Sequence, residues 1–285
     1  MNDRLFRNFS FLTATLAFFV LVGIFVTLYT YSLDAIKEFG FWDFISNSTW
    51  EVGEDDEGGV FGGFVPIVGT LLTTLIAMVL ATPLAMGIAV FLTEVATSWL
   101  IKPVSISIEL LAAIPSIIYG MWGLFYFAPI VQSAFGGSGI GLLTAGIVLA
   151  IMIVPFMSAI TTDSMNTTPD ILKESAYAIG ATKYEVVKDI VMPYSKVGII
   201  GSIILALGRA LGETMAVAFL LGSVMRLPSK ITDSTTSIPV LLANNFSEAE
   251  DLELSSMFYL ALILFVISFV IISTAKFYFL GRSKR

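Results

Sequence analysis

The sequence predicts an all-α membrane protein with six transmembrane helices, and three observations lead to this prediction. Hydrophobic residues make up 56% of the 285 residues, and charged residues only 13%, whereas a soluble domain carries roughly 25% charged residues. The mean hydropathy is +0.90. The apolar residues are also gathered into runs of about 20 or more, the length that a helix needs to cross a bilayer. We therefore expect lipid to surround this chain.

Six apolar runs have the length of a spanning helix. The first follows Arg4 and Arg7, but it is longer than the apolar part of a signal peptide and no small-residue cleavage site follows it, so we interpret it as a retained helix. Pro83, Pro115 and Pro155 lie inside spans and are expected to kink them; whether they act as hinges is left open. The predicted spans are residues 9–31, 64–93, 106–130, 142–162, 197–224 and 256–280.

The orientation follows from lysine and arginine, which accumulate in cytoplasmic loops. With the N-terminus in the cytoplasm, eleven of them fall on that side: Arg4, Arg7, Lys102, Lys173, Lys183, Lys188, Lys196, Lys276, Arg282, Lys284 and Arg285. Three fall outside, namely Lys37, Arg226 and Lys230, and Arg209 lies within a span. The bias predicts that both termini are cytoplasmic, and it places the acidic run Glu54–Glu57 outside.

The composition also excludes several functions. The chain has no cysteine and no histidine, so a disulfide framework, a Cys/His metal site, a cysteine nucleophile and a histidine base are all excluded. No GxxxxGK[ST] motif is present, so the chain has no P-loop for ATP. The net charge of −7 argues against nucleic acid. We predict no catalytic residue, no metal and no cofactor; an intramembrane enzyme is disfavoured further because no span holds two aspartates or a buried lysine.

The polar segment 163–196 is predicted to form two short helices. Thr168 and Pro169 are typical of a helix start, Gly180 of a left-handed stop, and Thr182 with Glu185 of a capping box that begins the second helix. Small residues in the first helix, Ser175, Ala176 and Ala178, leave room for another protein to approach. The alternative is an amphipathic loop that rests on the membrane surface.

The fifth predicted span contains two ionisable residues, Arg209 and Glu213. An ionisable group at the centre of the bilayer costs about 2.5–3.5 kcal/mol on insertion scales, so the two should pair, face the protein interior or line water. They are four residues apart and can meet on one helix face. They therefore form either an internal ion pair or a place where Arg209 exchanges its carboxylate for an anion.

Other polar and small residues lie close to Arg209 and Glu213 in the sequence. Thr214 adds a possible hydroxyl donor. Gly208, Gly212 and Ala216 form a stripe of small residues that lets a neighbouring helix come close. Packing alone is the simpler explanation of the two glycines.

The polar segment 163–196 resembles the EAA loop of ABC-importer permeases. The residues that carry the resemblance are Glu174, Ser175, Ala176, Gly180, Ile190 and Pro193. Ser175 replaces the usual first alanine, and Met192 replaces the usual leucine before the proline. In that family this loop forms a coupling helix that docks on the ATPase subunit, so the resemblance implies that role for Glu174, Ser175, Ala176 and Gly180.

Residues 208–217, Gly-Arg-Ala-Leu-Gly-Glu-Thr-Met-Ala-Val, resemble the signature of PstC-type permeases of the phosphate ABC importer, as do residues 61–70 and 114–123. The resemblance implies a type I (MetI-like) permease that carries inorganic phosphate, with Arg209, Glu213 and Thr214 on the substrate pathway. It also implies three kinds of partner: a PstA-like second permease, two PstB-like ATPase subunits and a PstS-like phosphate-binding protein. A similar oxyanion remains possible as the substrate.

On this reading the chain divides into residues 1–63, the first helix with an acidic outer loop; residues 64–280, the permease core with its coupling loop 163–196; and the basic tail 281–285. The outer loops 32–63 and 225–255 would receive the binding protein. The competing hypothesis is a secondary transporter or channel that uses Arg209 and Glu213 as an ion or proton relay. It leaves the EAA-like loop unexplained, and the chain shows no obvious inverted repeat.

Overall fold

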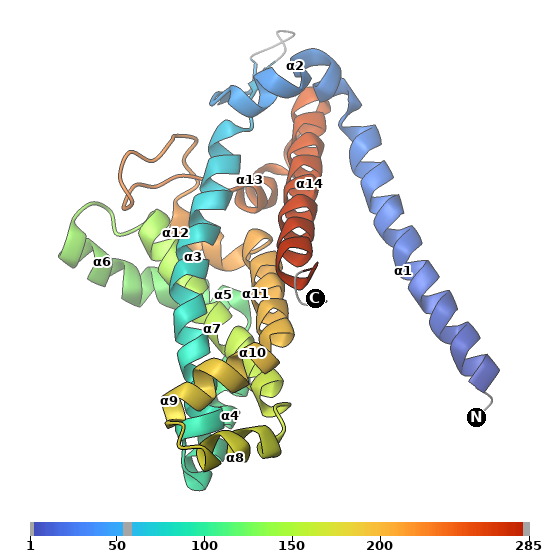
Figure 1. Ribbon diagram of the computed structural model, residues 1–285. Coiled ribbons are helices and arrows are strands. Elements are labelled where there is room, and N and C mark those ends of the chain that lie inside the picture. Colours follow the sequence, from blue (N-terminus) through green and yellow to red (C-terminus); the bar gives the residue numbers. More distant parts are fainter. Residues whose placement is uncertain (1–2, 54–58, 282–285) are drawn as a thin grey trace. The chain divides into compact units, whose positions relative to one another are not determined.

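The computed structural model describes residues 3–53 and 59–281, and these are mostly helical (Figure 1). The acidic run Glu54–Glu57 and most of the basic tail therefore lie outside the described residues. One short antiparallel ladder interrupts the helices, with Trp50–Glu51 (β1) opposite Val60–Phe61 (β2). Five helical segments in the described residues are long and apolar enough to cross a membrane: Leu5–Tyr31, Phe64–Val95, Ser116–Phe135, Leu142–Asn166 and Asp251–Phe277.

A sixth span arises if Lys183–Tyr194 and Lys196–Leu211, which bend by 71° at their junction, are taken as one. Four predicted spans correspond to single long helices. These are α1 (Asp3–Tyr31), α3 (Phe64–Val90) with its π-helical end η1 (Phe91–Val95), α7 (Leu142–Asn166) and α14 (Asp251–Gly281). The third and fifth predicted spans are interrupted.

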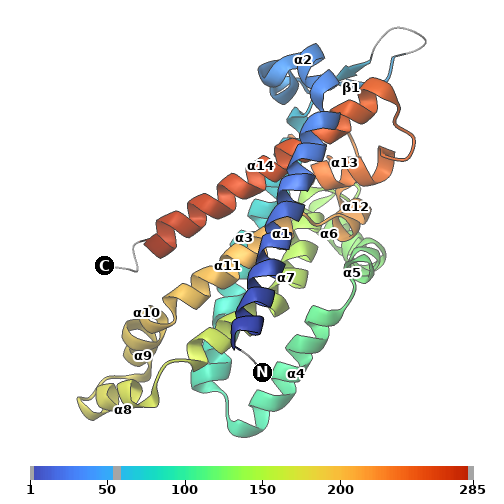
Figure 2. The same ribbon diagram turned by 90° about the vertical axis from the view of Figure 1, so that its right-hand side faces the viewer.

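The third predicted span, residues 106–130, is wrong as an unbroken helix. Helix α4 (Ser98–Ala113) ends before Pro115, and Ile114 adopts an extended ψ of 130°, because a proline ring disfavours the helical conformation of the residue before it. The candidate span starts instead at Ser116. It runs through α5 (Ser116–Trp122), η2 (Gly123–Phe127) and α6 (Ala128–Phe135). Figure 2 shows α4 and α5 as separate helices. Pro83 and Pro155, by contrast, lie within the continuous helices α3 and α7.

The fifth predicted span is also broken. Helix α11 (Lys196–Leu211) ends at Gly212, whose ψ of 2° is non-helical, and α12 (Met215–Leu221) starts three residues later. Gly222 ends α12 with a φ of +99°, a conformation that glycine adopts without a steric penalty. Glu213 and Thr214 therefore lie in a helix break and not on the face of a helix.

The described chain forms two compact units. The first contains residues up to 64 together with residues 241–267, that is α1, α2 (Leu33–Ser46), the β1–β2 ladder, the end of α13 (Ile238–Asn245) and the first part of α14. Ser255 on α14 fastens α2, because its Oγ donates to Tyr31 O at 2.8 Å and accepts from Ala35 N at 3.0 Å. The buried Phe44 packs on Tyr259, with the ring centroids 4.4 Å apart.

The second unit contains residues 65–240 and the end of the chain from 268. Its central helix is α7, whose apolar residues form the core with α12 and with a stripe of alanines on α3, namely Ala77, Ala81 and Ala85. Small residues at four-residue spacing let helix backbones approach closely. Helix α7 is joined to α11 by a buried hydrogen bond of 2.8 Å between Thr161 and Ser202.

Four short helical segments connect α7 to α11: α8 (Asp170–Ala178), α9 (Lys183–Val186), the π-helix η3 (Val187–Val191) and α10 (Met192–Tyr194). We call residues 163–196 the helical loop. The two predicted helices are present, and Gly180 between them has the expected positive φ of +89°. In Figures 1 and 2 α8 and α9 lie at the same end of the second unit as the turn between α3 and α4.

Residues 222–237 connect α12 to helix α13 (Ile238–Asn245). Gly69 on α3 lies against this segment, because a Cβ built on it would meet Thr236 O at 1.9 Å. The hydroxyl of Thr70 accepts a hydrogen bond from Ile238 N at 2.9 Å. The beginning of α3 therefore packs closely against the backbone of residues 236–238.

Candidate functional site

Arg209 lies near the end of α11 and is half-buried. Its guanidinium carbon is 5.4 Å from the centre of the Phe156 ring on α7, a distance at which the cation is attracted to the ring face. The ion pairs found in residues 3–53 and 59–281 are Lys37–Asp34 and Lys173–Glu94, so no carboxylate of the described chain neutralises Arg209. The internal ion pair with Glu213, one of the alternatives that the sequence left open, is not formed.

Glu213 fails to meet Arg209 because the helix stops between them, and the rule for residues four apart requires a continuous helix. Its carboxylate turns to α12 instead, where Oε1 accepts a hydrogen bond from Ala216 N at 3.2 Å. A carboxylate at a helix N-terminus satisfies a free N–H group and interacts favourably with the helix dipole. Thr214 donates its hydroxyl to Gly212 O at 3.3 Å. The side chains of Glu213 and Thr214 thus form hydrogen bonds to backbone groups at the helix break and stabilise it.

A small cavity lined by hydroxyl groups lies beside Glu213. Its lining residues are Thr70, Thr73, Thr74, Ala210, Leu211, Glu213, Val217, Ser237 and Pro239. The cavity has a volume of about 10 Å³, on the order of a single water site. We call it the hydroxyl cavity.

The hydroxyl groups around the hydroxyl cavity differ in their hydrogen bonds. Thr70 and Thr73 donate to the carbonyls of Pro66 and Gly69, one helical turn before them. Ser237, only 3% exposed, has no hydrogen-bond partner within the described chain. A buried polar group without a partner costs roughly 1–3 kcal/mol, so an unpaired hydroxyl in a cavity is a candidate contact for water or substrate.

The sequence reasoning missed the hydroxyl cavity. The signal on α3 was present, because Thr70, Thr73 and Thr74 have the spacing that places residues on one helix face. The distant Ser237 could not be assigned to them from the sequence. No group of three or more His, Cys, Asp or Glu side chains in the described residues is placed to hold a metal ion.

The predicted stripe of small residues does not lie on one helix, because the break at Gly212 separates Gly208 from Ala216. Ala216 is buried against α5, where a Cβ built on Gly120 would come within 2.9 Å of its Cα. A Cβ at Gly208 or Gly212 would make only ordinary van der Waals contact. Close packing within the chain therefore accounts for Ala216 and not for the two glycines.

The helical loop presents Glu174, Ser175 and Gly180 at the surface and buries Ala176. Ala176 belongs to an apolar cluster with Ala89, Met165, Val186, Val191 and Ile199. Its small side chain thus packs the loop on this chain, and it also lines a groove of about 390 Å³ on the loop surface. The adjacent surface carries Ile179, which is 88% exposed beside this groove lined by Gly180, Glu185 and other residues of the loop.

The predicted capping box is confirmed. Glu185 accepts hydrogen bonds from both the backbone N–H and the hydroxyl of Thr182 at 2.7 Å, and Glu185 N donates back to the Thr182 hydroxyl. These bonds, the backbone one first, lower the pKa of the Glu185 carboxyl. The predicted cap at Thr168 is wrong, because its buried hydroxyl has no partner in the described chain and Pro169 directly precedes the helix.

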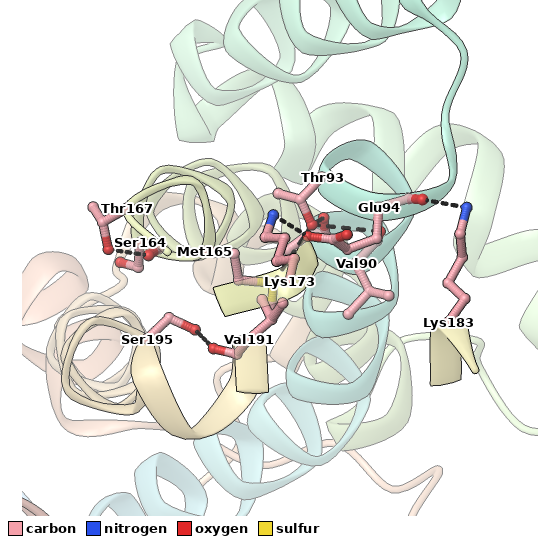
Figure 3. A network of polar contacts seen from close by, with 11 residues as sticks. Val90, Thr93, Glu94, Ser164, Met165, Thr167, Lys173, Lys183, Val191 and Ser195 are labelled. Carbon is pink, nitrogen blue, oxygen red and sulfur yellow. Dashed lines mark hydrogen bonds and ion pairs between the residues drawn. The ribbon is translucent and has the colours of Figure 1, made fainter. Parts of the chain in front are cut away.

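Glu94 ties the helical loop to the end of α3 (Figure 3). Its Oε1 is 2.6 Å from Lys173 Nζ on α8, and the two side chains are only 7% and 16% exposed. Its backbone carbonyl accepts a hydrogen bond of 2.7 Å from Lys183 Nζ at the start of α9. Lys173 and Lys183 were expected only as cytoplasmic charges, and the positions 94, 173 and 183 carry no sequence pattern that relates them.

The chain is similar to a known family and to known proteins. Residues 81–285 match the family model described as "Binding-protein-dependent transport system inner membrane component". The chain is 44% identical over 294 residues to the phosphate transport system permease protein PstC of Pasteurella multocida, with 96% of this chain and 90% of that protein covered. It is 43% identical to PstC of Haemophilus influenzae, with 96% and 92% covered.

Solved structures share the fold at low sequence identity. The methionine ABC transporter MetNI in inward-facing conformations superposes with a TM-score of 0.62 at 17% identity, with 77% of this chain and 95% of that chain covered. A bacterial alginate ABC transporter, in complex with a periplasmic protein that holds an alginate pentasaccharide, superposes with a TM-score of 0.65 at 15% identity. In that pair 96% of this chain and 94% of the other are covered. The predicted type I permease fold is confirmed.

Proposed function

The chain belongs to the family of binding-protein-dependent transport system inner membrane components and, within it, to the PstC phosphate permeases, and we propose that it carries inorganic phosphate through the membrane as half of the pathway of an ATP-driven importer. It is a multi-pass inner membrane protein. The relatives are permease subunits, and we place the ATPase activity on a separate partner.

The unneutralised Arg209 carries this proposal. A cation inside a membrane-spanning segment is costly unless an anion, a dipole or water compensates its charge. In the described residues Arg209 has the ring of Phe156 beside it and no ion pair with a carboxylate. The guanidinium fork donates parallel hydrogen bonds that match the oxygens of a tetrahedral oxyanion, and it stays charged at any physiological pH. A phosphate ion that passes Arg209 would therefore gain charge-assisted hydrogen bonds without breaking an internal ion pair.

Glu213, Thr214 and the hydroxyl cavity extend this path in the proposal. Ser237 and Thr74 offer hydroxyl groups to an anion, while the Glu213 carboxylate repels a fully ionised one and accepts a hydrogen bond from a protonated one. The cavity is too small for phosphate in this conformation. Residues 210–217 include the helix break and are the part of the wall whose movement would widen it.

The partners are assigned by surface and by relationship. The exposed Glu174, Ser175 and Gly180 of the helical loop, with the groove that Ala176 and Ile179 line, are the surface that we assign to two PstB-like ATPase subunits. A PstA-like permease completes the pathway, and a PstS-like binding protein delivers phosphate to residues 32–63 and 225–255. Lysine and arginine are more frequent in the segments on the side of the two termini than in the other loops, which supports cytoplasmic termini. The acidic outer segments favour delivery by a protein over capture of free anions.

Phosphate uptake by proteoliposomes that contain all four kinds of subunit tests the proposal. The variant Arg209→Gln should assemble normally and lose about 10- to 100-fold in uptake, because one hydrogen bond to a charged group contributes about 1.5–3 kcal/mol. Arg209→Lys should lose less, since it retains the charge without the fork. The control is Arg7→Gln, which removes an exposed arginine of α1. Normal uptake by Arg209→Gln would remove this residue from the mechanism.

The competing hypothesis of an ion or proton relay used Arg209 and Glu213 together. Its support is weaker because the two side chains do not form an ion pair. The same proteoliposomes distinguish it from the importer. Uptake that continues without ATP, but with a proton gradient, would contradict the importer.

A further inference from the structure

The contacts of Glu94 differ from those of an ordinary surface ion pair. An exposed lysine–carboxylate pair contributes little, because water screens it and two long side chains must be ordered. Lys37 and Asp34 on α2 are such a pair, 72% and 79% exposed and 3.3 Å apart. Lys173 and Glu94 are mostly buried and 2.6 Å apart. Water competes poorly for such a pair, so its geometry is held.

The main chain of Glu94 makes a second connection. Residue 94 lies in the last turn of η1, where backbone carbonyls lack partners within the helix. Lys183 Nζ supplies one at 2.7 Å, and a cation at a helix C-terminus is also favoured by the helix dipole. One residue is thus bonded to both helices of the helical loop, to α8 by its side chain and to α9 by its carbonyl.

Apolar packing surrounds these bonds. Ala89 on α3 belongs to the same buried cluster as Ala176 on α8 and Val186 on α9. Thr93, next to Glu94, donates its hydroxyl to Ala89 O at 3.0 Å and lies 3.9 Å from Met165 Sδ on α7. The loop, the end of α3 and the end of α7 are therefore packed as one piece (Figure 3).

The other end of the same helix lines the hydroxyl cavity. From Glu94 back to Thr74 the chain is helical without a break, and twenty residues of helix span about 30 Å. A displacement of the loop that moves the end of α3 would reach Thr70, Thr73 and Thr74 along this helix. The segment ends in a π-helical turn, a feature that occurs frequently at functional sites.

We propose that Glu94, with Lys173 and Lys183, is the linkage that transfers movement of the helical loop to α3 and so to the hydroxyl cavity. The three are positioning residues and do not touch substrate. The inference rests on the proposed function, because it assumes that an ATPase moves the loop. It adds the contacts through which a movement of the helical loop would displace α3.

The decisive variant is the neutral pair Glu94→Gln with Lys173→Met, which leaves no uncompensated buried charge. We expect the complex to assemble and to hydrolyse ATP, while phosphate uptake falls by about 5- to 150-fold, the usual range of a coupling between two sites. The ratio of ATP hydrolysed to phosphate transported should rise in proportion. A merely structural role would lower both rates together, in step with the amount of complex.

Two further variants complete the design. The reversed pair Glu94→Lys with Lys173→Glu should recover most of the uptake, because it restores the attraction. The control is Lys102→Met with Glu109→Gln, which removes the same two charges from exposed positions of α4 in the same unit. It should leave the ratio unchanged.

A neutral pair that transports like the control, with an unchanged ratio of ATP to phosphate, would overturn the linkage. If that pair fails to assemble, the single variants Glu94→Asp and Lys173→Arg decide, since they keep the charges and alter the length. An unchanged ratio in both would equally overturn it. Failure of the proposed function is distinguishable, because the unsubstituted complex would then take up phosphate without ATP whatever happens at Glu94.

Discussion

The variant Gly69→Ala tests the close approach between α3 and the segment before α13. The new Cβ would lie 1.9 Å from Thr236 O, a backbone atom, whereas even the closest C–H···O contacts keep carbon and oxygen about 3.3–3.6 Å apart. The backbone must therefore shift by more than an ångström. The adjacent hydrogen bond from Ile238 N to the Thr70 hydroxyl, 2.9 Å long, would then be broken or stretched.

The magnitude follows from two costs and one gain. Overpacking costs about 1–3 kcal/mol, and leaving the buried Ile238 N–H without its acceptor costs about 1–3 kcal/mol more. Alanine gains up to about 1 kcal/mol over glycine inside a helix. The net loss is about 1–5 kcal/mol of stability, and at about 2–4 °C for each kcal/mol this lowers the melting temperature by roughly 2–20 °C.

The matched control is Gly87→Ala, in the same helix, where an added Cβ meets no atom within 4 Å. We expect its melting temperature to stay the same or rise slightly. The assay is thermal unfolding of the purified protein in detergent, followed by the loss of the monodisperse peak. The reasoning would be refuted if Gly69→Ala melted at or above the temperature of Gly87→Ala.

Two further predictions concern single polar groups. Ser237→Ala removes an unpartnered buried hydroxyl, so we expect thermal stability to be unchanged or about 1 kcal/mol higher and phosphate uptake in proteoliposomes to fall; unchanged uptake would exclude the hydroxyl from the pathway. The pKa of Glu185 is lowered by its bonds from Thr182, so the capping box stabilises α9 fully above the carboxyl's ordinary pKa and loses that contribution as pH falls through the lower pKa of the folded state. Hydrogen exchange of the residue 182–186 amides should show this loss of protection at acidic pH, and the variant Glu185→Gln should not show it.

The broken fifth span shows where sequence reasoning reached its limit. Hydropathy predicted an unbroken helix, because Gly212, Glu213 and Thr214 lie among apolar residues and no proline marks the stop. The structure ends α11 at Leu211 and lets Glu213 bond the N–H of Ala216. At Pro115 a local signal did exist, since proline restricts the residue before it, yet a kink was expected and the helix ends there instead.

The sequence by itself determined the membrane as solvent, the approximate places of four long helices, the turn at Gly180 and the capping box of Thr182 and Glu185. These depend on composition, apolar length and bonds between residues at most a few positions apart. Only the tertiary structure decided that Arg209 stays without a carboxylate, that Ser237 meets the threonines of α3, and that Glu94 holds Lys173 and Lys183. Those residues are brought together by helix packing across long stretches of chain, and neither periodicity nor spacing specifies which side chains will meet.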